Sequence, residues 1–318
     1  MPAGRKNVLY SLKKMKKILL GGSPCTHWSI SQKPGKREVK ASGMGWELFK
    51  NYLIAKEKFK PDYFLYENNE SISKEIQAEI ENHLEVDLLH LDSALVSAQT
   101  RKRIYGTNIP GVETPKDRGV RVKNIIADGY KRENLINEVK FNSVDDTKNN
   151  NRMVRIGTIG KGGQGERVYS INGKSCTLSA NGGGRGAKTG LYLIDGAVRK
   201  LNAKEAERLQ TLPDGYTKAL NTDGHKYKAI GNGWTAEMII HILNHMDVAK
   251  DEELIVLSLY DGIATGRYCL ESLGYNNIMY FAYEIDGNPI KCAVDNYPDI
   301  IECGDAFKVR QSDWNLSM

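Results

Sequence analysis

A cysteine and a glutamate stand where two short apolar runs of the sequence end. Cys25 follows the run 15–20 and a glycine- and proline-bearing turn at 21–24, and Glu67 follows the run 63–66. A thiolate can attack an electrophilic carbon, and a carboxyl group at the end of a buried strand can donate a proton. Each residue also has a structural interpretation, because Cys25 could be a small core side chain and Glu67 a cap for the next helix.

Two arginines alternate in the segment 99–103, Gln-Thr-Arg-Lys-Arg. In an extended chain, residues two apart project to the same face, so Arg101 and Arg103 could approach one anionic or carbonyl-bearing ligand together. The alternative is an ordinary basic strand whose charges are solvated.

A glycine turn follows the strongly apolar run 254–259. The turn includes Asp261, Gly262 and Gly266 and leads into a helix expected over 267–273. Glycines let a ligand approach the backbone, and the amino end of a helix presents a positive dipole end. An ordinary glycine turn would have the same composition.

Two later strands also end in acidic residues. Glu284 follows the run 279–283, and Asp305 follows the strand expected at 300–302. A carboxylate in the first of these positions can accept hydrogen bonds from a ribose diol. The three strand ends together predict a site for a nucleoside cofactor, although the turn lacks the GxGxxG pattern of dinucleotide folds.

Strands and helices must alternate to position these groups. Helical spacing over 43–58 and 72–84 separates the early strands, and a further strand is expected at 86–91. This alternation predicts an α/β protein with a parallel sheet. The region 108–191 is different, because its apolar runs are short and Gly, Asn, Lys and Arg dominate, which indicates an inserted domain.

Composition limits the class of protein. The chain has 318 residues, 40% of them hydrophobic, and no apolar run reaches the roughly 20 residues of a membrane helix. The basic start, residues 1–17, is not followed by the features of a secretory signal, so we expect a cytoplasmic protein. None of the five cysteines forms a CxxC pair, which argues against a zinc site and a disulfide framework.

Positive charge is concentrated in the middle of the chain. Residues 101–200 contain 20 Lys and Arg against 9 Asp and Glu, whereas residues 201–318 contain 10 against 18. A local excess of this kind suits a polyanion such as nucleic acid, or it forms a solvated basic surface.

Taken together, these segments resemble the DNA (cytosine-5) methyltransferase family, from about residue 16 to residue 310. The resemblance is carried by GGSPC (21–25), YENN (66–69), QTRKR (99–103), RKLNAKEAERLQTLPDGY (199–216), IGNGW (230–234), LSLYDGIATG (257–266), EID (284–286) and GD (304–305). The family usually has Glu-Asn-Val where this chain has Glu67-Asn68-Asn69, and Phe is common where it has Tyr260.

The order of the motifs differs from the usual family order, in which the cofactor strand comes first. The resemblance therefore implies a circularly permuted, Rossmann-like class I methyltransferase sheet with helices on both faces and a small inserted target-recognition domain. We expect the nucleophile half of the catalytic domain at 1–107, with 1–14 as an extension. The target-recognition domain is expected at 108–191 and the cofactor half at 192–318.

The resemblance also implies roles for individual residues. Cys25 would add to carbon 6 of cytosine, Glu67 would engage ring nitrogen 3, and Arg101 and Arg103 would orient Glu67 or the base. S-adenosylmethionine would be the cofactor, bound by Tyr260, Asp261, Gly262, Ile263, Thr265, Gly266, Glu284, Ile285, Asp305, Asn232 and Trp234. The residues expected at DNA are Gln99, Arg185 and Lys188, although the last two could lie in a flexible surface loop.

The implied partner is double-stranded DNA, bound by a monomer in a bacterial or phage-infected cell. Whether a cognate restriction endonuclease exists is left open. Two other functions also stay open: a catalytically silent DNA-binding homologue, and an RNA cytosine methyltransferase that uses the same chemistry.

Overall fold

A seven-stranded sheet forms the centre of the computed structural model, which describes residues 15–30, 35–128, 138–148, 150–180 and 185–314. The extension expected at 1–14 lies outside these residues. The strand order is β12-β11-β10-β1-β2-β4-β3. The strands are β1 (Lys16–Gly21), β2 (Tyr63–Asn69), β3 (Leu89–Asp92), β4 (Lys102–Thr107), β10 (Leu254–Leu259), β11 (Ile278–Tyr283) and β12 (Ile301–Glu302).

Most neighbouring strands of this sheet are parallel. The run from β12 through β11, β10 and β1 to β2 is parallel throughout, whereas β4 pairs antiparallel with both β2 and β3. Every residue of β10 is buried, as expected for a strand covered on both faces. The predicted α/β class is therefore confirmed, with one strand of opposite direction.

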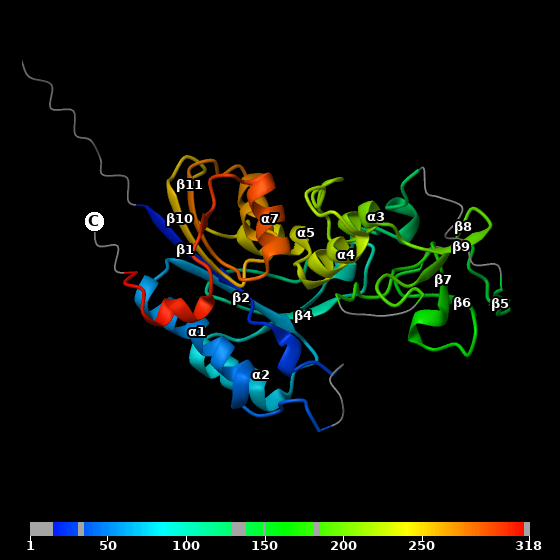
Figure 1. Cartoon of the computed structure of the whole chain (residues 1–318), viewed down its shortest axis with the longest axis horizontal. Coiled ribbons are helices and arrows are strands. Elements are labelled where there is room, and N and C mark those ends of the chain that lie inside the picture. Colours follow the sequence, from blue (N-terminus) through cyan, green and yellow to red (C-terminus); the bar gives the residue numbers. More distant parts are fainter. Residues whose placement is uncertain (1–14, 31–34, 129–137, 149, 181–184, 315–318) are drawn as a thin grey trace, which may run out of the picture.

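Helices cover both faces of the sheet (Figure 1). On one face, α1 (Gly43–Phe59) and α2 (Lys74–Leu84) pack in a core that includes Leu19. On the other, α5 (Ala236–Leu243), α6 (Thr265–Ser272) and α7 (Gly287–Asn296) pack in a core that includes Ile18 and Leu20. Alternate residues of β1 thus enter opposite cores, as the two-residue period of a strand requires.

The strand order reverses between β10 and β1. From β10 the chain continues to β11 on one side, and from β1 it continues to β2 on the other. Ligands bind to open α/β sheets at the carboxyl ends of the strands beside such a reversal. The chain places the short helix η1 (Cys25–His27) after β1 and the turn 260–264 after β10, so both lie at this edge.

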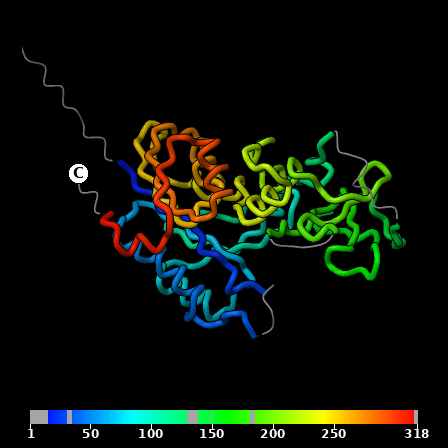
Figure 2. Tube along the Cα trace, viewed as in Figure 1, coloured from blue at the N-terminus to red at the C-terminus, as the bar shows by residue number. Residues whose placement is uncertain are grey.

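A second sheet lies at one end of the molecule, as the green part of Figure 2 shows. Its order is β5 (Lys140–Phe141), β6 (Arg155–Thr158), β7 (Arg167–Ser170), β8 (Leu191–Ile194) and β9 (Ala197–Lys200). It falls largely within the insertion expected at 108–191, but β8 and β9 extend it to residue 200. Two helices, α3 (Ala203–Leu209) and α4 (Asp223–Asn232), follow it.

Short helices complete the described part of the chain: η2 (Ser93–Leu95), η3 (Val122–Asn124), η5 (Gln164–Glu166) and η6 (Ala306–Arg310). None of the helices in the residues that the structure describes has the length and apolar character of a membrane span.

Candidate active site

The turn that carries Cys25 runs very close to the end of β2. Cys25 is the first residue of η1, after Pro24, and is partly buried. A Cβ atom on Gly22 would lie 2.8 Å from the backbone oxygen of Glu67 and 3.1 Å from its Oε2 atom. Only glycine therefore allows the turn to approach Glu67 this closely.

A buried hydrogen-bond network fastens this turn to β2. The Asn68 amide nitrogen donates to the carbonyl of Ser23 (3.0 Å) and to the hydroxyl of Tyr66 (2.9 Å), and the Ser23 and Tyr66 hydroxyls are 2.7 Å apart. Asn68 was not among the predicted site residues. An amide beside Glu67 in the YENN motif was the signal that could have identified it as a positioning residue.

Two side chains from distant segments hold the carboxylate of Glu67. Arg103 Nε lies 2.8 Å from Oε1, and Trp234 Nε1 donates to Oε2 at 3.1 Å. The pairing of β2 with β4 places Arg103 opposite Asn69, two residues along from Glu67. Glu67 and Arg103 are each only about one eighth exposed (13% and 12%), so water competes little for these contacts.

Arg101 and Arg103 have different partners, although they alternate in sequence. The Arg101 guanidinium is buried and donates to the carbonyls of Gly231 (3.1 Å) and Gly233 (2.9 Å), after which Trp234 follows. Burial and the charge of Arg103 lower the pKa of Arg101 to about 9. Of the two arginines, Arg103 has the ion pair with Glu67, and Arg101 fixes the backbone that carries Trp234.

Gln99, expected at DNA, is fully buried. Its amide nitrogen donates to the carbonyl of Leu209 (2.8 Å) and to Oε1 of Gln210 (2.8 Å), and its Oε1 accepts from the backbone of Leu178 (3.3 Å). In the free protein Gln99 is therefore not available to DNA, and its side chain joins the end of α3 to the backbone of Leu178.

The Cys25 thiol lies in the electrostatic field of these groups. Burial raises its pKa, Glu67 raises it further, and Arg103 and Arg101 oppose the rise. The thiol is therefore the favoured form in the free protein at neutral pH, and a ligand that neutralises or moves Glu67 would make the thiolate easier to form.

The turn after β10 adopts a left-handed backbone at three residues. Tyr260 (φ 58°), Gly262 (φ 65°) and Ala264 (φ 59°) all have positive φ angles. The hydroxyl of Tyr260 donates to the carbonyl of Leu48 (2.7 Å) and accepts from Asn51 (3.1 Å), which anchors the turn to α1. Two costly non-glycine conformations in one turn indicate a functional constraint on its shape.

Asp261 has one paired and one unpaired oxygen. Its Oδ1 atom accepts hydrogen bonds from Ser258 and Tyr280, both at 2.6 Å, while its buried Oδ2 atom has no partner among the described residues. The buried hydroxyl of Thr265 is likewise unpaired. Burial raises the pKa of Asp261 to about 6. Polar groups left unpaired in a glycine turn are suited to the polar groups of a ligand.

Glu284 holds the next strand end against this turn. Its Oε2 atom accepts from the backbone of Gly262 (3.0 Å), and its Oε1 atom accepts from Ile285 (2.8 Å) and Asp286 (2.9 Å). Ile285 is 73% exposed, which leaves an apolar surface beside the carboxylate. A carboxylate next to an exposed apolar side chain fits a ribose with its attached base.

The other predicted cofactor residues lie in this turn, at the start of α6, at the end of α4 and after β12. Ile263 and Gly266 are buried, and a Cβ atom on Gly266 would lie 2.7 Å from Leu20. Asp305 is exposed and caps η6 by accepting from Phe307 (2.9 Å). Asn232 ends α4, which an ion pair between Lys228 and Asp286 (2.7 Å) ties to the start of α7. The donor set and the unpaired atoms fit S-adenosylmethionine.

The predicted DNA contacts Arg185 and Lys188 lie shortly before β8, and the carbonyl of Lys188 accepts a hydrogen bond from the backbone of Ser179 (3.0 Å). Arg185 is exposed, and Lys188 lines a hollow with Lys200 and Tyr227, its Nζ atom 6.0 Å from the centre of the Tyr227 ring. Residues 181–184, which precede Arg185, lie outside the described residues. The DNA contacts of Arg185 and Lys188 stay a prediction.

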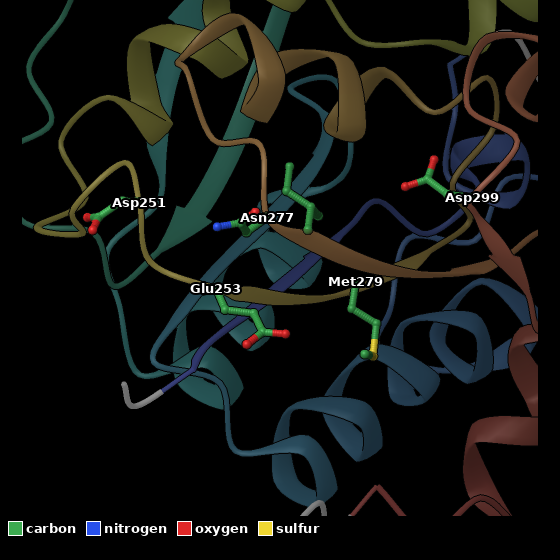
Figure 3. A pocket seen from close by; sticks show the side chains of 6 residues that line it. Asp251, Glu253, Asn277, Met279 and Asp299 are labelled. Carbon is green, nitrogen blue, oxygen red and sulfur yellow. The ribbon is translucent and has the colours of Figure 1, made fainter. Parts of the chain in front are cut away.

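Another hollow lies at the opposite edge of the main sheet (Figure 3). Its lining comes from the segments at the amino ends of β10, β11 and β12, and half of the lining residues are acidic: Asp251, Glu253, Asn277, Ile278, Met279 and Asp299. No predicted site residue belongs to it.

Comparisons with known proteins show the family of the chain. The sequence profile of a family described as C-5 cytosine-specific DNA methylase matches residues 5–247. The type II methyltransferase M.HhaI of Haemophilus parahaemolyticus is 32% identical over 252 residues, which cover 72% of this chain and 74% of that protein. Because the family profile and this relative each match most of the chain, the chain belongs to the C-5 cytosine-specific DNA methylase family and is a DNA (cytosine-5) methyltransferase.

Proposed function

We propose that this enzyme transfers a methyl group from S-adenosylmethionine to carbon 5 of a cytosine flipped out of double-stranded DNA, with Cys25 as the nucleophile. The observation that carries the proposal is the convergence at one sheet edge. Glu67 there is held by Arg103 and Trp234, beside the Cys25 turn, and the half-paired Asp261 follows the neighbouring strand.

Cys25 and Glu67 activate the base together. The Cys25 thiolate forms a bond to carbon 6, and the π electrons of the ring shift so that carbon 5 becomes nucleophilic. Glu67 protonates or hydrogen-bonds ring nitrogen 3, where negative charge develops. Arg103 and Trp234 keep the carboxyl group of Glu67 in place for this contact.

The cofactor supplies an electrophilic methyl group on a positively charged sulfur. Asp261, Thr265 and Glu284 would hold it, and Ile285 would pack on its adenine, with Trp234 closing the pocket from the turn between α4 and α5. After transfer, the carbon 5 proton leaves to a base through water, the bond from Cys25 to carbon 6 breaks, and the thiolate is restored.

The insertion at 108–191 is proposed to read the DNA sequence. A duplex hides carbons 5 and 6, so the target cytosine must leave the stack before Cys25 can reach it. The excess of Lys and Arg in residues 101–200, including Arg185 and Lys188, would contact phosphates and groove edges. The name of the relative includes the words "type II methyltransferase". We propose that this chain likewise acts in restriction-modification and protects DNA from a cognate endonuclease.

Strand order supports the proposed circular permutation. When strands are counted from β10 to β12 and then from β1, the sheet order begins 3-2-1-4-5, the start of the usual doubly wound order. The family match ends at residue 247, shortly before β10 begins at Leu254.

Packing near the two ends supports the same proposal. Phe59 at the end of α1 lies under the Nζ atom of Lys17 (5.5 Å from the ring centre) and 6.1 Å from the ring of Trp314. The beginning of β1 and the end of the described chain therefore meet at one residue. Neighbouring ends are what a permutation requires.

Methyl transfer from tritiated S-adenosylmethionine to duplex DNA and to RNA of the same sequence tests the reaction. Duplexes that contain 5-fluorocytosine should trap a covalent protein–DNA complex, because the fluorine on carbon 5 cannot leave as a proton does. Cys25→Ser should abolish both label transfer and the trapped complex. Cys176→Ser, which removes another partly buried cysteine, is the matched control and should retain both.

Three results would contradict parts of the proposal. Label transfer to RNA alone would exclude duplex DNA as the substrate. A covalent complex that persists in Cys25→Ser would exclude Cys25 as the nucleophile. Bisulfite sequencing of host DNA that carries the gene should show methylcytosine at one recurrent sequence, and methylation without such a sequence would exclude the proposed specificity.

A further inference from the structure

Glu302 lies at the carboxyl end of β12, in a position that the methyl-transfer mechanism does not use. In the sheet register it pairs with Ala282, which pairs with Ser258. Side chains of paired residues in parallel strands project to the same face, so Glu302 shares a face with Ser258, whose hydroxyl donates to Asp261. Glu302 therefore approaches the cofactor turn from the third strand.

Both carboxyl oxygens of Glu302 are buried and have no hydrogen-bond partner among the described residues. Buried carboxyl groups are normally paired, because an unpaired one loses its hydration without compensation. The Oδ2 atom of Asp261, whose charge acts on Glu302, is also buried and unpaired. Unpaired carboxyl oxygens thus come from the ends of β10 and β12, the two strands that flank β11.

Three carboxyl groups surround this part of the site. Burial, together with the negative charges of Asp261 and Glu284, raises the pKa of Glu302 to about 7. The three groups are close enough to repel one another, so a cation bound among them would relieve the repulsion.

Building on the assignment of S-adenosylmethionine as methyl donor, we propose that Glu302 supplies a third negative charge that makes the site prefer the cationic donor to its neutral product. Donor and product share the same adenosine and amino-acid groups. They differ in the sulfur, which is a positively charged sulfonium in S-adenosylmethionine and an uncharged thioether in S-adenosylhomocysteine. A fixed negative charge therefore discriminates between them and favours product release.

The preference depends on the ionisation of Glu302. Below the pKa of Glu302 the group is neutral and contributes no discrimination, and above it the carboxylate favours the donor, so the preference rises between about pH 6 and pH 8. Other ionisable groups near this strand end are Asp261 after β10, Tyr280 of β11, Glu284 after β11, Cys303 after β12 and Lys308 of η6. Asp261, with a pKa near 6, contributes at the acidic end of this range.

Titration calorimetry with the full-length protein, S-adenosylmethionine and S-adenosylhomocysteine tests the proposal at pH 6 and pH 8. Glu302→Gln should weaken donor binding about tenfold at pH 8, which corresponds to a change of about one unit in the pKa of Glu302 when the donor binds. The same substitution should change product binding by less than about twofold. Glu302→Asp, which retains the charge, should keep most of the preference. Asp299→Asn removes an exposed carboxylate at the opposite edge and should change neither affinity.

Two outcomes would overturn the role of Glu302: equal weakening of donor and product in Glu302→Gln, or a preference that stays at its wild-type value. Thermal unfolding of each apo variant detects a folding defect, and Glu302→Asp then decides between charge and shape. If the wild-type protein binds neither compound, the assignment of the cofactor fails instead, which is a separate result.

Discussion

Replacement of Trp234 by Phe isolates the hydrogen bond that one side of Glu67 receives. The indole Nε1 atom donates to Oε2 of Glu67 at 3.1 Å, while Arg103 holds Oε1 at 2.8 Å. Phenylalanine retains an aromatic ring beside Gly266, whose Cβ would lie 3.7 Å from the Trp234 ring. The substitution therefore removes the donor and leaves most of the packing.

The expected loss follows from the charge of the acceptor. A hydrogen bond to a charged group contributes about 1.5–3 kcal/mol, which corresponds to about 10-fold to 150-fold in rate if the whole contribution is used in the transition state. Arg103 still orients Glu67, so we expect a loss near the lower end, about tenfold. Single-turnover methyl transfer with saturating duplex DNA and S-adenosylmethionine measures it.

A matched control separates this loss from a general effect of replacing tryptophan. The indole nitrogen of Trp314 is buried without a partner among the described residues, and its ring packs on Phe59 and Phe281, so Trp314→Phe should leave the single-turnover rate unchanged. The reasoning is refuted if Trp234→Phe turns over within about twofold of wild type, or if the whole loss is explained by weaker cofactor binding.

Three further predictions use other parts of the site. Alkylation of Cys25 by iodoacetamide should need a more alkaline pH than a free cysteine, and Glu67→Gln should speed it at pH 8, because Glu67 raises the pKa of the thiol; slower labelling would contradict this sign. Gly22→Ala should cost about 1–3 kcal/mol of stability in thermal unfolding and most of the methyl transfer, since its Cβ would meet the carbonyl of Glu67. A chain rejoined from residue 314 to residue 15 and opened within 248–252 should unfold cooperatively and methylate DNA, and an insoluble or inactive product would count against the proposed permutation.

Local sequence patterns predicted the strands that position the site. The run 254–259 is apolar at nearly every position, which is typical of a central parallel strand, and β10 is buried along its whole length. The runs before Cys25 and Glu67 likewise became β1 and β2, which pair with each other. Because parallel strands end at one edge, the proximity of Cys25 and Glu67 followed from the strand assignments.

The partners of the two arginines could not be predicted in the same way. A period of two predicts that Arg101 and Arg103 share one face, but which one meets Glu67 depends on the antiparallel register of β4 against β2. The burial of Gln99 depends on α3, whose Leu209 and neighbouring Gln210 lie more than a hundred positions away in the sequence. The partner of Glu67 and the burial of Gln99 both depend on contacts between distant segments, which local spacing in the sequence does not reveal.

Chain connectivity matters little to this site, because its groups are brought together by strand pairing. In the present order, β1 and β10 pair residue for residue from Lys16 with Leu254 to Gly21 with Leu259. Through the proposed joint of residues 314 and 15, the loop between them would be about four times shorter, which changes the loop-closure free energy by only about 1 kcal/mol. A difference of this size affects the folding rate through contact order more than it affects the folded sheet. The carboxyl edge that carries Cys25, Glu67 and Asp261 therefore keeps its geometry in either order of the chain, since every hydrogen bond that defines it lies within the sheet or the turns and helices that flank it.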